Sequence, residues 1–199
     1  MDLISFKQRV CDTIKHCAAD YKSVFLDCEY LIYSEDFKKN PYYILKAEEG
    51  NYKHLTGVNS NIAPYDFFQK CINNTLTEND FDFIRKGMPE AFTKGIVRNK
   101  IIALPLMMNM FNEPIIAQEN FRKGLVACSV AASDNNITIG FENRIVVRPK
   151  TLLRGNELEK GKTVDVSLVL KRSTGAVKFD TIVRGDNEIY VNFRNKNVI

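Results

Sequence analysis

Residues 137–148 of the chain read ITIGFENRIVVR, and this stretch decides the fold. Two short runs rich in isoleucine, valine and phenylalanine, at 137–142 and 145–148, flank a polar turn. Branched and aromatic residues in runs this short are typical of β-strands, and a short polar turn between two such runs is typical of a hairpin. The stretch therefore predicts two neighbouring antiparallel strands.

The same pattern extends over the C-terminal part of the chain. Further runs rich in Val, Ile, Leu, Phe and Thr lie at 121–132, 164–171, 176–183 and 188–193. Asp-Asn-Asn, Ser-Thr-Gly and Gly-Asp-Asn turns separate several of these runs. We therefore expect a twisted antiparallel meander over residues 121–199.

The N-terminal part is mainly helical. Apolar residues at helical spacing predict an amphipathic helix within residues 3–21. Aromatic and branched runs at 24–33 and 41–46 then predict a short hairpin. Helix signals, proline positions and a capping-box-like Thr77 predict helices at 64–73, 77–87, 90–99 and 101–111, the last bent at Pro105.

Helices followed by strands indicate an α+β fold with helices on one side of an antiparallel sheet. We expect residues 1–22 to form an amphipathic helix packed on the body, and residues 23–199 to form a single α+β domain. No repeat, low-complexity tract or linker divides the sequence.

The composition excludes several classes of protein. At 199 residues, with 45% hydrophobic and 26% charged residues, the chain is that of a globular protein. The sequence has neither an apolar run long enough to cross a membrane nor a secretory signal, so we expect a cytoplasmic protein without a membrane partner. The five cysteines form no C-x-x-C pair and only two histidines are present. We therefore expect reduced, buried thiols and no metal or other cofactor.

The basic residues are concentrated in the C-terminal part. Residues 121–199 hold 14 Lys and Arg against 8 Asp and Glu, a net charge of +6, whereas residues 1–120 carry a net charge of −2. This asymmetry favours a polyanionic partner such as a nucleic acid. A solvated basic surface that binds nothing is the alternative.

His54 is the most informative single residue, because imidazole exchanges protons near neutral pH and the other histidine, His16, lies in the first amphipathic helix. Lys53 and Thr56 flank His54, and Gly57 permits a tight reversal of the chain. We expect these side chains to converge where a short strand ends. A structural, hydrogen-bonded histidine is the alternative.

Two basic segments provide further candidates. The run Arg148-Pro149-Lys150-Thr151 is expected to leave a strand and enter a loop, where its cations and hydroxyl could hold a phosphate. Lys171 and Arg172 end a later strand. Solvated loop charge, or the flank of a hairpin turn, is the alternative for both segments.

Familiar catalytic motifs are absent. The sequence contains no phosphate-binding loop, dinucleotide fingerprint, zinc-protease helix or serine-hydrolase elbow. The paired carboxylates Asp27/Glu29 and Asp80/Asp82 leave a metal-dependent nuclease as an alternative, but alternation on strand or helix surfaces explains these pairs equally well.

The string YKHLTGV at residues 52–58 resembles the aromatic-x-His-Leu-x-Gly signature of the phage-associated barnase-EndoU-colicin-RelE-like nucleases, in particular the group numbered fourth among the phage types. Further short matches keep the family order: YILK at 43–46, IGF at 139–141, Pro149 with TLL at 151–153, LK at 170–171 and FD at 179–180. The resemblance covers roughly residues 25–185. Thr151 stands where the family has serine, and Phe179 where it has tyrosine, which puts a phenolic role at that position in question.

The resemblance implies a barnase/EndoU/RelE-like fold and a metal-independent endoribonuclease of toxin or effector type, carried by a phage or mobile element. Such an enzyme uses the 2′-hydroxyl of RNA as nucleophile and leaves a 2′,3′-cyclic phosphate. His54 would then act as general acid or base, Lys171 and Arg148 would stabilise the phosphate, and Thr151 would donate a hydrogen bond. The remaining substrate contacts are expected from Lys53, Thr56, Lys150 and Arg172.

The expected partners are RNA, tRNA included, and a neutralising protein. A module on the same fold that binds RNA or a protein without cleaving is the alternative function. The two functions differ in whether His54 and Lys171 meet in one cleft. Nothing in the sequence fixes the oligomeric state.

Overall fold

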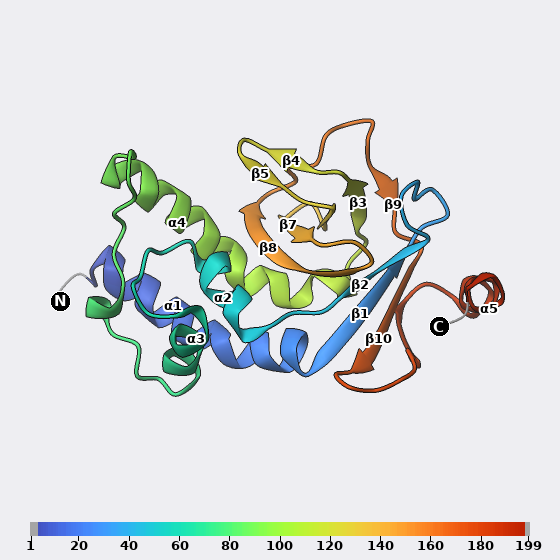
Figure 1. Ribbon diagram of the computed structural model, residues 1–199, viewed down its shortest axis with the longest axis horizontal. Coiled ribbons are helices and arrows are strands. Elements are labelled where there is room, and N and C mark those ends of the chain that lie inside the picture. The colour runs from blue at the N-terminus through green and yellow to red at the C-terminus, as the bar shows by residue number, and fades with distance from the viewer. Residues whose placement is uncertain (1–3, 198–199) are drawn as a thin grey trace.

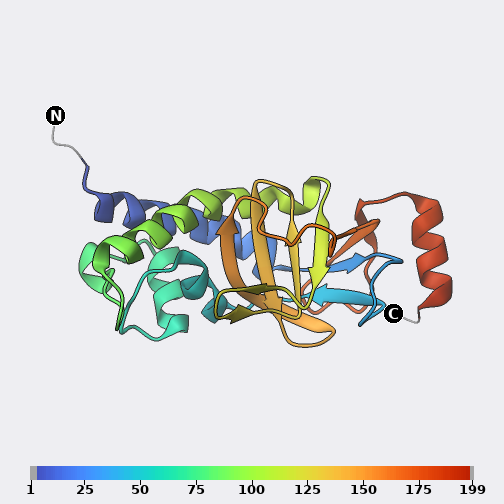
Figure 2. The same ribbon diagram turned by 90° about the horizontal axis from the view of Figure 1, so that it is seen from above.

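The computed structural model describes residues 4–197, which form a mixed α and β structure. The α-helices are α1 (Phe6–Tyr21), α2 (Glu49–Thr56), α3 (Pro64–Ile72), α4 (Glu90–Leu106) and α5 (Asn187–Lys196). The strands are β1 (Cys28–Tyr33), β2 (Tyr42–Leu45), β3 (Ile116–Glu119), β4 (Arg122–Lys123), β5 (Val126–Ala127), β6 (Val130–Ser133), β7 (Ile137–Glu142), β8 (Val146–Arg154), β9 (Val164–Asp165), β10 (Leu168–Ser173) and β11 (Thr181–Arg184). Figures 1 and 2 show α1 to α4 gathered at one end, the sheet in the middle and α5 at the opposite end. The predicted α+β class is confirmed.

Nine strands form one curled sheet in the order β11-β10-β1-β2-β8-β7-β6-β3-β9. Neighbouring strands are antiparallel except β2 and β8, which are parallel. Only Val166 and Ser167 separate β9 from β10 in the chain, although these strands stand near opposite ends of the sheet order. Since two residues span less than about 10 Å, the sheet must curl until its ends approach each other. The expected meander in chain order is wrong, because β1 and β2 are inserted between β10 and β8.

The main core lies between the helices and one face of the sheet. Val10 and Ile14 of α1 and Leu104 of α4 are fully buried in it, together with Val169 and Leu152 of the sheet. A second cluster on the other face packs Phe193 of α5 against sheet residues Leu31, Tyr33, Leu168 and Leu170. A third, smaller cluster lies below the separate β4–β5 hairpin and contains Phe121, Cys128 and Ala131.

The expected strand over 24–33 begins later than predicted. Residues Lys22–Leu26 extend α1 by a π-helical turn, and β1 starts at Cys28. Phe25 is buried in this turn, where its ring lies 5.6 Å from that of Tyr21 and 6.0 Å from that of Phe111. Burial of the aromatic side chain against the helices thus overrides its strand propensity.

Three other expected elements differ in type. The segment around His54 is helix α2 rather than the end of a strand, because Glu48 and Asn51 form a reciprocal capping box and Gly57 ends the helix with φ of 76°. The helix expected over 77–87 is a single 3-10 turn, Glu78–Asp80, although its capping box is present. The strand expected over 188–193 is helix α5, capped by Asp186, whose side chain accepts a hydrogen bond from the Ile189 backbone at 2.8 Å.

The C-terminal strands also differ in extent. Strand β8 runs on through Arg154, so residues 148–151 lie in the sheet rather than in a loop. The run 121–132 divides into β4, β5 and β6, and the run 164–171 divides between β9 and β10. Within residues 4–197, no helix combines the length and apolar character needed to cross a lipid bilayer.

Candidate active site

An open pocket of about 490 Å³ lies where α2 packs beside β8. Its lining comes from α2, the first residue of α3, the ends of β7 and β5, and the middle of β8. The lining residues are Gly50, Asn51, His54, Pro64, Val126, Glu142, Arg148, Pro149, Lys150 and Thr151. Four of the eight residues expected at the site, His54, Arg148, Lys150 and Thr151, are thus brought together from distant parts of the chain.

Helix α2 holds His54 on its exposed face. Its neighbours Tyr52 and Leu55 are fully buried, and the Tyr52 hydroxyl donates to the Ile14 carbonyl at 2.6 Å. The imidazole of His54 is exposed and makes no hydrogen bond to any residue between 4 and 197. The alternative of a hydrogen-bonded structural histidine is therefore not favoured, because the ring is available to a ligand in the pocket.

Two cations face one carboxylate in this pocket. Lys150 Nζ lies 3.0 Å from Glu142 Oε2, and Arg148 Nε lies 3.7 Å from Glu142 Oε1. Arg148 Nη1 also donates to Glu48 Oε2 at 3.2 Å, which ties the first turn of α2 to the sheet. Both basic side chains remain 40% exposed, so an incoming phosphate can reach them.

An irregularity in the pairing of β7 with β8 directs three side chains into the pocket. Glu142 pairs with Arg148, Phe141 with Pro149 and Gly140 with Thr151, so Lys150 is an extra residue in β8. Such a bulge lets Arg148, Lys150 and Thr151 share one face, and Pro149 between them is buried at the edge of the pocket. A Cβ at Gly140 would lie 2.6 Å from Cys128 Sγ and 2.8 Å from Thr151 Cγ2. The absence of a side chain at 140 therefore makes room for Thr151.

Lys53 and Thr56 lie outside the pocket lining. Lys53 Nζ donates to the carbonyls of Ser60 and Ile62, both at 2.6 Å, and burial lowers its pKa. The Thr56 hydroxyl is buried and donates to the Lys53 carbonyl at 2.7 Å. Both side chains thus fix the end of α2 and the loop that follows it, instead of facing a substrate.

Lys171 and Arg172 also lie away from the pocket, since β1 and β2 separate their strand from β8. Lys171 shares the helix-facing side of β10 with Val169. Arg172, on the other face, donates to Glu29 and lies over the Phe179 ring at 4.2 Å from its centre. His54 and Lys171 therefore do not meet in one cleft.

Glu29 explains why Arg172 is fixed. This carboxylate is 2% exposed and receives Arg172 Nε at 2.8 Å and Lys46 Nζ at 3.0 Å. Burial acts to raise the pKa of Glu29, but the hydrogen bonds from Arg172 and Lys46 outweigh it and hold the pKa below its ordinary value. The cluster is a structural ion network of the sheet.

Replacing Glu29 by glutamine is expected to destabilise the fold by about 2 kcal/mol at pH 7, because Arg172 and Lys46 lose their anion. The loss is limited to this size because Lys46 is only half-buried and water still solvates its ammonium group. Since the folded-state pKa is depressed, this stabilisation is fully present above the unfolded carboxyl pKa near 4.5 and is lost as pH falls through the folded value. Urea unfolding of wild type and Glu29→Gln at pH 7 and under acid conditions measures both effects. A difference in stability that grows on acidification would contradict this account.

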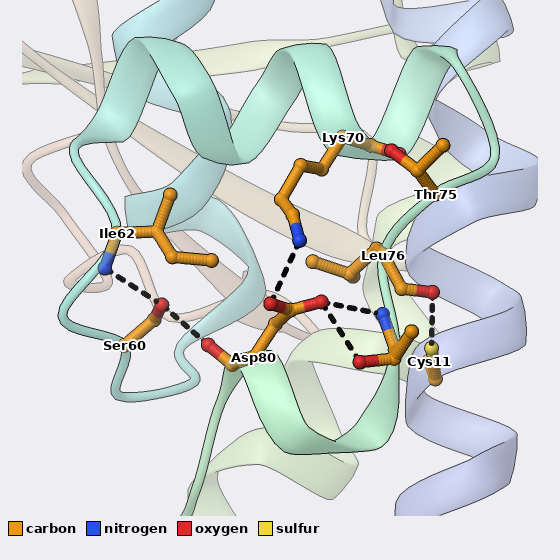
Figure 3. A network of polar contacts seen from close by, with 8 residues as sticks. Cys11, Ser60, Ile62, Lys70, Thr75, Leu76 and Asp80 are labelled. Atoms are coloured by element: carbon orange, nitrogen blue, oxygen red, sulfur yellow. Dashed lines mark hydrogen bonds and ion pairs between the residues drawn. The ribbon is translucent and has the colours of Figure 1, made fainter.

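The other paired carboxylates are also engaged by protein groups. Asp27 pairs with Lys22 at 2.9 Å, and Asp82 accepts from Asn59 Nδ2 at 2.8 Å. Figure 3 shows Asp80 beside Lys70, whose Nζ lies 2.8 Å from its carboxylate, while the Asp80 carbonyl accepts from Ser60. No group of three or more His, Cys, Asp or Glu side chains with the geometry of a metal site occurs in residues 4–197.

Glu142 is the residue at the pocket that sequence reasoning missed. It is the last residue of β7, and strand alternation places its side chain on the same side as Gly140. A carboxylate at the end of an apolar strand could have been selected as a candidate from the sequence alone. Its pairing with Arg148 and Lys150 across the bulge depends on the register of two strands. A carboxylate, an imidazole and two cations therefore line one pocket, a combination suited to acid–base chemistry on a phosphate ester.

The chain matches a model of a known protein family. The family model described as phage-Barnase-EndoU-ColicinE5/D-RelE like nuclease4 matches residues 13–197. None of the curated proteins and none of the solved structures matches the chain. The family match begins within α1 and covers every later helix and strand, so it includes all the pocket residues.

Proposed function

The chain belongs to the phage-Barnase-EndoU-ColicinE5/D-RelE like nuclease 4 family, and on that premise we propose that it is a metal-independent endoribonuclease. The observation that carries the proposal is the joint placement of His54, Glu142, Arg148 and Lys150 around one open pocket. A nuclease of the barnase, EndoU, colicin or RelE type is the activity that the family indicates. The choice of RNA and of the reaction rests on the chemistry of these four side chains.

The proposed reaction is an attack within the substrate. The ribose 2′-oxygen loses its proton to a base and forms a bond to the adjacent phosphorus, while the bond from phosphorus to the 5′-oxygen breaks. An acid protonates the departing 5′-oxygen, so the products are a 2′,3′-cyclic phosphate and a 5′-hydroxyl. The nucleophile belongs to the substrate, and the protein supplies proton transfer and charge stabilisation.

Each pocket side chain has a role in this scheme. Glu142 accepts the proton of the 2′-hydroxyl, and protonated His54 donates a proton to the leaving oxygen. Arg148 and Lys150 stabilise the negative charge that develops on the non-bridging oxygens. Thr151, which is 6% exposed at the pocket, donates a hydrogen bond to one of these oxygens.

The position of His54 supports an enzyme over a module that only binds RNA or a protein. The separation of Lys171 from His54 is what the binding module predicts. That module also predicts a buried and hydrogen-bonded His54, whereas the ring is exposed and lies beside two cations. Lys171 is removed from the proposed chemistry, because β1 and β2 lie between its strand and the pocket. In the proposed reaction Lys150, instead of Lys171, stabilises the phosphate together with Arg148.

The proposal extends to the biological setting. We propose a toxin or effector of a phage or mobile element that acts on RNA, tRNA included, in the cytoplasm. A neutralising protein for such an enzyme would have to cover the pocket around His54 or displace the substrate from Arg148 and Lys150.

Two oligonucleotides of identical sequence, one RNA and one DNA, test the substrate class. In excess chelator the protein is expected to cleave the RNA and to leave the DNA intact, because DNA lacks the 2′-hydroxyl. The assay follows labelled strands on a denaturing gel. Cleavage of both strands, or cleavage that stops on addition of chelator, would contradict the proposed reaction.

A further inference from the structure

Lys100 lies against the end of helix α2, which carries His54. Its Nζ donates to the His54 backbone carbonyl at 3.2 Å, although Lys100 itself belongs to α4. The last carbonyls of a helix have no partner within the helix and attract cations, because the helix dipole is negative there. Lys100 thus satisfies the carbonyl of the one residue in α2 whose side chain could transfer protons in the pocket.

Gly57 makes this contact possible. It ends α2 with φ of 76°, and a Cβ at this position would lie 2.4 Å from Lys100 Cδ and 3.2 Å from Cε. The stem of Lys100 therefore passes directly over the backbone of Gly57. A second cation, Arg85, donates through Nη2 to the Gly57 carbonyl at 2.5 Å.

Packing fixes both partners of the contact. α4 is anchored in the core by Val97, Ala103 and Leu104, all fully buried. At its other end α2 is tied to the sheet through the ion pair of Glu48 with Arg148. Burial, with Arg85 nearby, lowers the pKa of Lys100 to about 8.

We infer that Lys100 is a positioning residue for the nuclease reaction: it fixes the backbone of His54 and thereby orients the imidazole in the pocket. This inference rests on the proposed function. Lys100 does not line the pocket and its Nζ contacts the His54 backbone, so its effect on the reaction passes through His54. A displacement of about 1 Å of an acid–base group can lower a reaction rate about a hundredfold. Loss of the contact between Lys100 and His54 is therefore expected to lower kcat measurably.

The test compares the steady-state cleavage of an RNA oligonucleotide by Lys100→Met, Lys100→Arg and a control, Lys94→Met. Lys94 lies on the same helix and pairs with Glu90 at 2.8 Å, away from α2. We expect Lys100→Met to lower kcat by about tenfold to a hundredfold with KM within about twofold of wild type. Lys100→Arg keeps the cation and its donors and is expected to restore most of kcat, while Lys94→Met behaves as wild type.

Unchanged kcat in Lys100→Met, or a failure of Lys100→Arg to restore activity, would overturn the inference. Thermal unfolding shows whether each variant folds. If Lys100→Met does not fold, Lys100→Gln is used instead. The same loss of kcat is expected, because the shorter glutamine side chain also loses the hydrogen bond to the His54 carbonyl. The two proposals can be contradicted separately. Full activity of His54→Ala would contradict the proposed function. An inactive His54→Ala together with a fully active Lys100→Met would contradict only the role of Lys100.

Discussion

Replacing His54 by alanine is expected to lower the rate of RNA cleavage by about 10²- to 10⁴-fold, the range of a lost general acid or base. The imidazole is exposed at the pocket and makes no contact that the fold needs, so the variant should fold as well as wild type. The two measurements are single-turnover cleavage of a labelled RNA and thermal unfolding. RNA binding should change little, because Arg148 and Lys150 remain.

His16 supplies a matched control. It is the other histidine of the chain, it is also exposed, and it lines a different hollow beside Cys71 and Pro105. His16→Ala is expected to cleave RNA at the wild-type rate. Equal losses in both histidine variants would indicate a general effect on the fold, and full activity of His54→Ala would remove His54 from the reaction.

Replacing Glu142 by glutamine is expected to lower kcat by about 10²-fold or more while RNA binding is retained or becomes tighter. The amide cannot accept the proton of the 2′-hydroxyl. Loss of the negative charge also frees Arg148 and Lys150, which the carboxylate holds at 3.7 Å and 3.0 Å, for the phosphates of the substrate. A fall in kcat together with a lower Kd is therefore the expected signature.

Glu157 provides the control for Glu142. It pairs with Lys123 and lies outside the pocket lining. Glu157→Gln is expected to leave kcat and Kd for RNA near their wild-type values. If Glu142→Gln cleaves at the wild-type rate, Glu142 serves only to balance the charge of the two cations and another group must act as base.

Local sequence patterns predicted the parts of the fold that local forces decide. The alternation in ITIGFE gave strand β7, and Pro64 gave the start of α3. The prediction that a short strand ends near His54 is wrong, although the sequence carries the signals of α2. The reciprocal pair Glu48 and Asn51, read together with Gly57, would have indicated a short helix.

Residue type and the resemblance predict only part of the pocket lining, because strand order is not a local property. His54, Arg148, Lys150 and Thr151 could be selected from residue type and from the resemblance. Lys171 was placed with them on the same grounds, but the insertion of β1 and β2 separates it from β8. Glu142 enters the site only through the bulged register of β7 on β8, which residue type and spacing do not show.

The central claim is that the pocket around His54 cleaves RNA by transfer to the 2′-oxygen. The most direct test is to identify the 3′ ends that the wild-type protein leaves on labelled total RNA in excess chelator, beside His54→Ala. The account predicts 2′,3′-cyclic phosphate ends with wild type and an almost complete loss of them in the variant. Ends that carry a 3′-hydroxyl, or the same cyclic ends from both proteins, would contradict it.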